Sequence, residues 1–194
     1  MESTTYNKII TAATSCFSKK GFYATSIADI AHQAGMSQGA MYRHFRGKEE
    51  LIIAIVKEEA DRAVAFYSAP YECTALERIY QLAKSCIMKN GSPITASLWI
   101  EIIAESAKNQ EVNKYYLAAD TAMRDALKQI IKKGLSDGEF QSIEAEEASI
   151  VLFAILDGLI ARRAIQAKFD IEQSLPSLEK MLLALLNPSQ TPSN

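Results

Sequence analysis

The chain has 194 residues, of which 48% are hydrophobic and 23% are charged, and 21 Lys and Arg against 23 Asp and Glu give a formal net charge of −2. This composition excludes a disordered or collagen-like chain. No apolar run approaches the roughly 18 residues that a membrane span needs. A negative net charge also argues against a nucleic-acid binder, provided that the charge is spread evenly along the chain.

The charge is not spread evenly. Residues 1–48 carry a net charge of +4, whereas the remaining residues carry −6. The average therefore hides a basic segment in front of an acidic one, and it does not exclude a DNA-binding protein. We expect the acidic part to be repelled by a duplex and to help orient the basic part toward it.

The cysteines indicate a reducing compartment. Cys16, Cys73 and Cys86 are an odd number in no metal-binding or redox spacing. The N-terminus shows no basic region leading into an apolar one, as a signal peptide would. We expect a cytoplasmic protein with no membrane, metal or cofactor partner, and the absence of a catalytic signature predicts that it is not an enzyme.

The first 48 residues read as three short helices. Ile9, Ala13 and Phe17 recur on one helical face, and Gly21 is a natural end for that helix. Thr25 or Ser26 can cap the next helix, which ends near residue 34. A glycine at 35 then allows a left-handed turn, and a serine at 37 can cap a third helix. Two helices crossing at such a turn form a helix-turn-helix.

The third helix divides by angle into two faces, at about 100° per residue. Met41 and Phe45 fall on the inward face. The opposite face carries Gly39, Tyr42, Arg43 and Arg46. A small residue, an aromatic ring and two cations suit a helix that enters the major groove of DNA.

Individual side chains fit that role. Gly39 permits close approach, and Gln38 at the start of the helix can pair with a base edge. Tyr42 and His44 can donate to phosphates. Lys48, in the first turn of the following helix, can add a phosphate contact together with the N-terminal amides of that helix.

The remaining sequence has helical periodicity and no sustained alternation of period two, so a sheet is not expected. One predicted helix starts at Lys48-Glu49-Glu50 and ends by Pro70. Five further helices are predicted at about 73–89, 93–107, 110–134, 144–168 and 172–187. The fold class is therefore all-α with about nine helices. We predict a DNA-binding domain at 1–48, a ligand-binding and dimerisation domain at 49–187, and a disordered tail at 188–194.

A run of positions in the first quarter of the chain matches one known signature: Thr25, Ile30-Ala31, Ala34-Gly35-Met36-Ser37, Gly39, Met41-Tyr42, His44-Phe45, Lys48 and Leu51. These residues resemble the DNA-binding signature of the TetR family of bacterial transcriptional regulators, over about residues 6–53. Met36 and Met41 replace its Val and Leu, and both keep an apolar residue. More than a dozen positions in register are more specific than a short motif.

The resemblance implies a homodimer of helical subunits. Its first three helices bind DNA, its body encloses a ligand pocket, and its last two long helices form the dimer interface. By this resemblance, the residues that contact DNA phosphates are Thr25, Ser26, Tyr42, His44 and Lys48. The residues that face the base edges in the groove are Ser37, Gln38, Gly39 and Ala40. Arg43 joins the DNA-binding set on the angular argument alone.

The body offers candidates for the pocket, although core packing explains residues of this kind as readily. The candidates are Met88, Trp99, Glu101, Ile102, Tyr115, Tyr116, Met123 and Phe153. Glu101 and Glu105 lie four residues apart, so they either form a solvated face or point inward and favour a cationic ligand. Residues 101–109 also faintly resemble BetI-type members of the family, which respond to a quaternary amine.

Two late segments are too apolar for exposed helices, namely 148–161 and the leucine-rich stretch from Leu175 to Leu186. They indicate a second copy of the chain as partner and hence a roughly palindromic operator. The sequence favours a ligand-responsive transcriptional repressor that a small amphipathic effector releases from double-stranded DNA. The alternative is a helical small-molecule or redox sensor, with Cys73 or Cys86 as the sensing thiol, that does not itself repress transcription.

Overall fold

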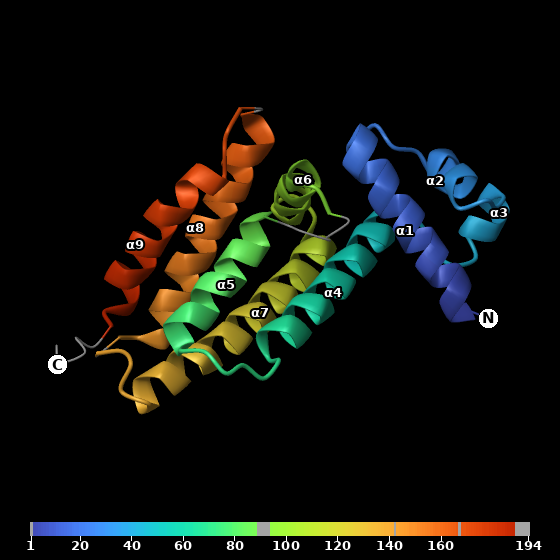
Figure 1. Cartoon of the computed structure of the whole chain (residues 1–194). Coiled ribbons are helices and arrows are strands. Elements are labelled where there is room, and N and C mark those ends of the chain that lie inside the picture. The colour runs from blue at the N-terminus through green and yellow to red at the C-terminus, as the bar shows by residue number, and fades with distance from the viewer. Residues whose placement is uncertain (1, 89–93, 142, 167, 189–194) are drawn as a thin grey trace. The chain divides into compact units, whose positions relative to one another are not determined.

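The computed structural model describes residues 2–88, 94–141, 143–166 and 168–188, and within them it contains nine α-helices and no strand (Figure 1). The helices are α1 (Glu2–Lys20), α2 (Ile27–Gln33), α3 (Gln38–Met41), α4 (Lys48–Tyr67), α5 (Ala75–Met88), α6 (Ala96–Ser106), α7 (Gln110–Ser136), α8 (Ala145–Ile165) and α9 (Leu175–Leu186), with a 3-10 turn at Glu172–Ser174. The predicted all-α class is confirmed.

Most helix boundaries agree with the sequence to within three residues. Two predictions, the break at 90–93 and the tail from residue 189 onward, lie outside the described residues. Pro188 is described, and it forms an isolated antiparallel bridge with Phe140. Within the described ranges, no helix is long and apolar enough to cross a membrane.

The chain divides into two compact units, one of residues 1–61 and 91–119 and the other of residues 62–90 and 120–194. Helices α4 and α7 contribute residues to both units. The sequence predicts a division into consecutive segments at residue 48, whereas these two units are defined by which residues pack together. The predicted boundary between a DNA-binding and a ligand-binding domain therefore stays a prediction.

The first unit has one continuous hydrophobic core. Helix α1 packs against α2 and α6, and α2 packs against α3. The largest side chains in this core are almost fully buried, and they come from α1, α2, α3, α4 and α6: Phe17, Ile30, Met41, Leu51, Leu98 and Ile102. The short helices of the head therefore share a core with α6, which the sequence assigned to the body.

In the second unit, α5, α8 and α9 pack against one another (Figure 1). The large buried side chains of the last two helices recur every fourth position, so they form one stripe on each helix. These side chains are Leu152, Leu156 and Ile160 on α8, and Leu178, Leu182 and Leu186 on α9. The other faces of the two helices leave Ile150, Val151, Ile165, Met181 and Leu183 exposed in the single chain.

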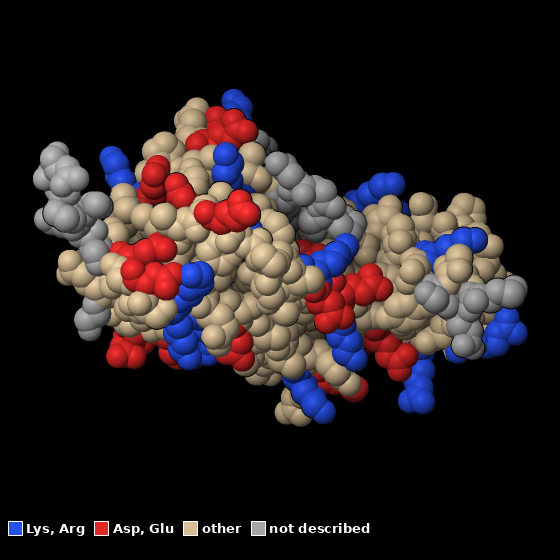
Figure 2. Space-filling model, turned by 60° about the horizontal axis from the view of Figure 1, so that its bottom comes forward, with Lys and Arg blue, Asp and Glu red and all other residues tan. Residues whose placement is uncertain are grey.

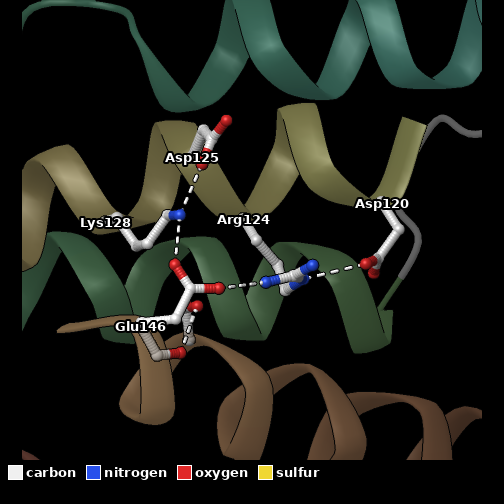
Figure 3. A network of polar contacts seen from close by, with 6 residues as sticks. Asp120, Arg124, Asp125, Lys128 and Glu146 are labelled. Atoms are coloured by element: carbon white, nitrogen blue, oxygen red, sulfur yellow. Dashed lines mark hydrogen bonds and ion pairs between the residues drawn. The ribbon is translucent and has the colours of Figure 1, made fainter. Parts of the chain in front are cut away.

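A network of ion pairs joins α7 to the first turn of α8 in this unit (Figure 3). Arg124 donates to Asp120 and to Glu146 at 2.8 Å each, and Lys128 pairs with Asp125 and with Glu146. The two cations lower the pKa of the Glu146 carboxyl, with the hydrogen bond from Lys128 as the largest cause. Only 17% of each cationic side chain is exposed, whereas the shared Glu146 side chain is 54% exposed, so water and salt reach the carboxylate end of the network.

Candidate nucleic-acid interface and ligand region

The connection between α1 and α2 is formed by local capping. Gly21 ends α1 with a φ of +83°, a left-handed conformation that favours glycine. Ser26 caps α2, since its hydroxyl accepts from the Asp29 N–H at 3.1 Å while the Asp29 carboxylate accepts from the Ser26 N–H at 2.9 Å. Of the two capping residues that the sequence allowed, Ser26 is the one used. This reciprocal capping box sets where α2 begins.

The turn between α2 and α3 also follows the sequence. Gly35 has a φ of +67°, and the Ser37 hydroxyl accepts from the Ala40 N–H at 3.2 Å. The helical angles were applied as far as Arg46, but the helix itself is shorter, because α3 ends at Met41. The N–H groups of Arg43 and His44 donate to carbonyls three residues back, so the chain tightens into turns.

The division of this segment into two faces is confirmed. Met41 and Phe45 are 0% and 5% exposed. Ring contact with Tyr6 of α1, at 5.5 Å between centroids, covers Phe45 further. The exposed set is Ser37, Gln38, Gly39, Tyr42, Arg43, His44 and Arg46, with Ala40 half-buried. All of the proposed base-reading positions are therefore at least partly exposed to solvent.

Two predicted phosphate contacts behave differently. Thr25 is 2% exposed, and its hydroxyl donates to the carbonyls of Gly21 at 2.7 Å and Cys16 at 3.3 Å. That hydroxyl is turned inward, because it satisfies carbonyls left open at the end of α1. Ser26 is exposed but is engaged in the capping box.

Lys48 begins α4, as predicted, but its ammonium has partners within the protein. It donates to the carbonyls of Phe22 at 2.7 Å and Tyr23 at 3.2 Å. It also lies 4.7 Å from the centroid of the Phe22 ring. An ammonium has three protons, so one remains for a further acceptor.

The charges of the head are mostly open to solvent. The Arg46 side chain is 93% exposed, and its pair with Glu50 is long, at 3.8 Å. Lys20 and Asp29 pair at 2.6 Å, and this contact is the largest of the causes that lower the pKa of the Asp29 carboxyl. Figure 2 shows Lys and Arg side chains interspersed with groups of Asp and Glu on the face of the molecule that it draws.

Glu101 and Glu105 fit neither of the expected alternatives. Glu101 accepts from the Phe22 N–H at 2.6 Å, and Glu105 accepts from the Tyr23 hydroxyl at 2.6 Å. A solvated face is wrong for Glu105, which is 8% exposed. The two carboxylates bind the chain just after α1, so the inclusion of Glu101 among the pocket residues conflicts with its contacts.

The other pocket candidates of the first unit separate into two groups. The rings of Trp99 and Tyr116 lie 6.1 Å apart at the edge of the core, and Ile102 is completely buried in it. Tyr115 instead has the ammonium of the exposed Lys57 4.0 Å from its ring centroid. Trp99 and Tyr116 are thus brought together, whereas the face of Tyr115 holds a cation of the chain itself.

Met88, Met123 and Phe153 belong to the second unit, where Met123 is 8% exposed and the other two are half-buried. Two surface hollows lie in the first unit, and none of the eight pocket candidates lines either of them. The pocket assignment therefore stays a prediction. The thiols of the redox alternative, Cys73 and Cys86, are half-buried and are not joined in a disulfide, and the Cys86 sulfur lies 2.9 Å from the Tyr67 hydroxyl.

Two residues with unusual contacts were missed by the sequence analysis. Tyr23, which binds Glu105, is one of them. Arg78 is 7% exposed, donates to the Phe66 carbonyl and lies 5.6 Å from the centroid of the Tyr71 ring. Arginine is seldom buried without a charged partner, but no local pattern signals such burial, since the rings that cover Arg78 come from before α5.

No group of three or more His, Cys, Asp and Glu residues suited to a metal ion occurs in the part of the chain that the structure describes. His32 and His44 are both exposed.

Comparison with known proteins matches both parts of the chain to family models. Residues 9–55 match bacterial regulatory proteins of the tetR family, and residues 75–187 match the C-terminal part of BetI-type transcriptional repressors. The HTH-type transcriptional regulator UidR of Escherichia coli strain K12 is 26% identical over 159 residues, which are 81% of this chain and 80% of UidR.

Solved structures agree with these matches. GusR of Salmonella enterica superposes with a TM-score of 0.79 at 27% identity, over 94% of this chain and 95% of GusR. A transcriptional regulator from Saccharomonospora viridis, in complex with choline, superposes with a TM-score of 0.81 over 98% of this chain and 100% of its own. At 19% identity, that second likeness bears on the fold alone.

Proposed function

The chain belongs to the tetR family and is a DNA-binding transcriptional regulator, and from this premise we propose that it is a repressor which a small amphipathic effector releases from a palindromic operator. The observation that carries the proposal is the exposed face of residues 37–46 above the buried Met41 and Phe45. That face has the size and the polar groups of an element that reads the major groove.

We divide the contacts of this face by their chemistry. Ser37, Gln38, Gly39 and Ala40 stand at the start of α3 and are assigned to base edges, with Gln38 as the side chain that reaches furthest. Tyr42, Arg43, His44 and Lys48 are assigned to phosphates, together with Ser26. The Thr25 hydroxyl is left out of the assignment because it is turned inward.

A footprint of the purified protein on the DNA upstream of its own gene tests the function. The proposal expects one discrete, roughly palindromic footprint, with half-sites about one turn of DNA apart. Binding that covers the fragment evenly, with no protected site, would contradict it and would favour the sensor that does not repress.

Two substitutions then test the division of contacts. Gln38→Ala is expected to relax the preference at one base pair, by about 1–3 kcal/mol of lost discrimination. Tyr42→Phe keeps the ring and removes only the hydroxyl, so it should weaken binding to specific and random duplexes by the same factor. Indistinguishable effects of the two variants on specific and random DNA would contradict the assignment.

We assign dimerisation to α8 and α9. Their outer faces expose large apolar side chains in the single chain, and a second copy of the same surface would cover them. Two heads related by a two-fold axis require an operator of the same symmetry.

The effector is assigned to the region of Trp99 and Tyr116, where two large rings with polar groups meet at the edge of the core. Decanoate and decyltrimethylammonium, each below its micelle-forming concentration, share an apolar tail and differ in the sign of the head group. Because Glu101 and Glu105 are bound by Phe22 and Tyr23, they do not favour the cation. We therefore expect decanoate to release DNA at least as well as decyltrimethylammonium and to change Trp99 fluorescence. Release by neither compound would contradict an effector of this kind.

A further inference from the structure

Residues Phe22 and Tyr23, called here the exit segment, are held by side chains from two other helices. From α6, Glu101 accepts from the Phe22 N–H and Glu105 accepts from the Tyr23 hydroxyl, both at 2.6 Å. From the start of α4, the Lys48 ammonium donates to both carbonyls of the segment. In these four hydrogen bonds, two donors of the exit segment face carboxylates and its two carbonyls face a cation, so each bond has a charged partner and is stronger than a neutral hydrogen bond.

The packing around the exit segment leaves little freedom. Phe22 is 2% exposed, and Glu105 is 8% exposed. A methyl group on Gly21 would lie 2.8 Å from the Glu101 carboxylate, so this side chain of α6 lies directly against the backbone where α1 ends. Breaking one of these hydrogen bonds would leave a buried carboxylate or carbonyl with fewer partners, which is costly.

Lys48 nevertheless remains accessible. Together with Tyr23, Glu105 and Lys108 it lines an open hollow on the surface of this unit. With two protons directed at the carbonyls of the exit segment, the third is available to an acceptor that arrives from solvent. An ammonium fixed in this way does not have to be ordered again when it meets a phosphate, and ordering a long side chain at an interface opposes binding.

We propose that Tyr23 and Glu105 are positioning residues for DNA binding: through the exit segment, α6 holds the Lys48 ammonium in the place from which it meets a phosphate. This inference rests on the proposed function, in which Lys48 contacts the DNA backbone. Tyr23 and Glu105 do not touch DNA themselves. Their effect passes through the carbonyl groups of Phe22 and Tyr23.

The test is a double-mutant cycle on DNA affinity. Tyr23→Phe removes only the hydroxyl that binds Glu105, and because 64% of Tyr23 is exposed the variant keeps the core intact. Lys48→Gln removes the cation. A labelled duplex of random sequence serves as the probe, since a phosphate contact does not depend on sequence, and binding is followed by fluorescence anisotropy between 50 and 200 mM salt. Far-UV circular dichroism verifies that each variant is folded.

The expected results separate the two residues. Lys48→Gln should reduce the slope of log K against log salt by about 0.9, the value for one lost phosphate contact. Tyr23→Phe should keep the wild-type slope and weaken binding about twofold to tenfold, the cost of ordering one long side chain. In the Lys48→Gln background, Tyr23→Phe should have no further effect.

Lys20→Gln is the matched control. Lys20 is another lysine of the head, and its ammonium pairs with Asp29, whereas the carbonyls of the exit segment accept from Lys48. Tyr23→Phe should weaken binding by the same factor in this background as in the wild type. If its factor is also unchanged in the Lys48→Gln background, Tyr23 acts through general structure and the inference is overturned.

The proposed function fails in a different way. If Lys48→Gln leaves the salt slope unchanged, the phosphate contact of Lys48 is wrong, and the inference that rests on it is overturned as well. If no protein in the series binds duplex DNA, the proposed function is contradicted, and the inference that rests on it is overturned with it. Glu105→Leu removes the acceptor from α6 and leaves an apolar side chain of similar size at this buried position, so it should reproduce the dependence on Lys48 that Tyr23→Phe shows.

Discussion

Gly158 offers a test of the dimer that the surface of α8 implies. It lies in the interior of α8 on the exposed side of the helix, and a methyl group added there meets no atom within 4 Å in the single chain. Within one chain, Gly158→Ala should therefore be stabilising by about 1 kcal/mol, because alanine favours the helix over glycine by that amount.

In the dimer, Gly158→Ala is expected to be destabilising instead of stabilising. If Gly158 permits close approach of the partner helix, the added methyl group overpacks the interface by about 1–3 kcal/mol. Two-fold symmetry places two such methyl groups in one interface, so dissociation becomes easier by about 2–6 kcal/mol. The dimer Kd should then rise about thirtyfold or more, because each 1.4 kcal/mol is a factor of ten.

Sedimentation equilibrium measures the dimer Kd, and urea unfolding at concentrations below that Kd measures the single chain. Gly134→Ala is the control, since its methyl group would lie 2.6 Å from Cδ2 of Phe140 and 2.9 Å from Cβ of Ala75, inside one chain. Overpacking of about 1–3 kcal/mol there outweighs or cancels the helical gain of about 1 kcal/mol. Gly134→Ala should thus leave the urea midpoint unchanged or lower it, and it should not change the Kd. An unchanged Kd for Gly158→Ala would refute the assignment of this face to the dimer.

Three further predictions concern stability. Ser26→Ala removes the cap of α2 and should lower the free energy of unfolding by about 1 kcal/mol, as measured by urea denaturation, whereas Ser26→Asp should keep most of it. The pKa of the Asp29 carboxyl is lowered in the folded state, so its contribution to the free energy of unfolding is present above the unfolded pKa of about 3.9 and is lost as pH falls toward the folded pKa. In Asp29→Asn, the urea midpoint should therefore fall less steeply as the pH is lowered. A fall identical to that of the wild type would contradict this. Glu146→Gln removes the negative charge that Arg124 and Lys128 share, so the Tm should fall and its salt dependence should weaken. A Tm equal to that of the wild type would show that the network does not stabilise the fold.

Local rules accounted for the parts of the head that depend on neighbours in sequence. Gly35 and Ser37 were predicted as turn and cap because backbone conformation and side-chain capping involve residues only a few positions apart. The inward placement of Met41 and Phe45 followed from helical angles, and it holds although α3 ends at Met41. The family signature comes from the same stretch, which is why the function could be assigned without the structure.

The tertiary structure decided which polar groups meet. Glu101 and Glu105 bind residues 79 and 82 positions earlier, and no periodicity in α6 could distinguish that arrangement from a solvated face or a cation site. The anchoring of Lys48 likewise depends on the carbonyls of Phe22 and Tyr23, which lie 26 and 25 positions earlier and meet α4 only in the folded chain. A buried charged side chain binds the polar groups that lie within its reach, and the packing of the helices decides which groups those are. The sequence alone thus determined the helices, the two faces of the DNA-reading segment and the family, whereas the packing of α6 against the head decided which charges remain free to meet DNA.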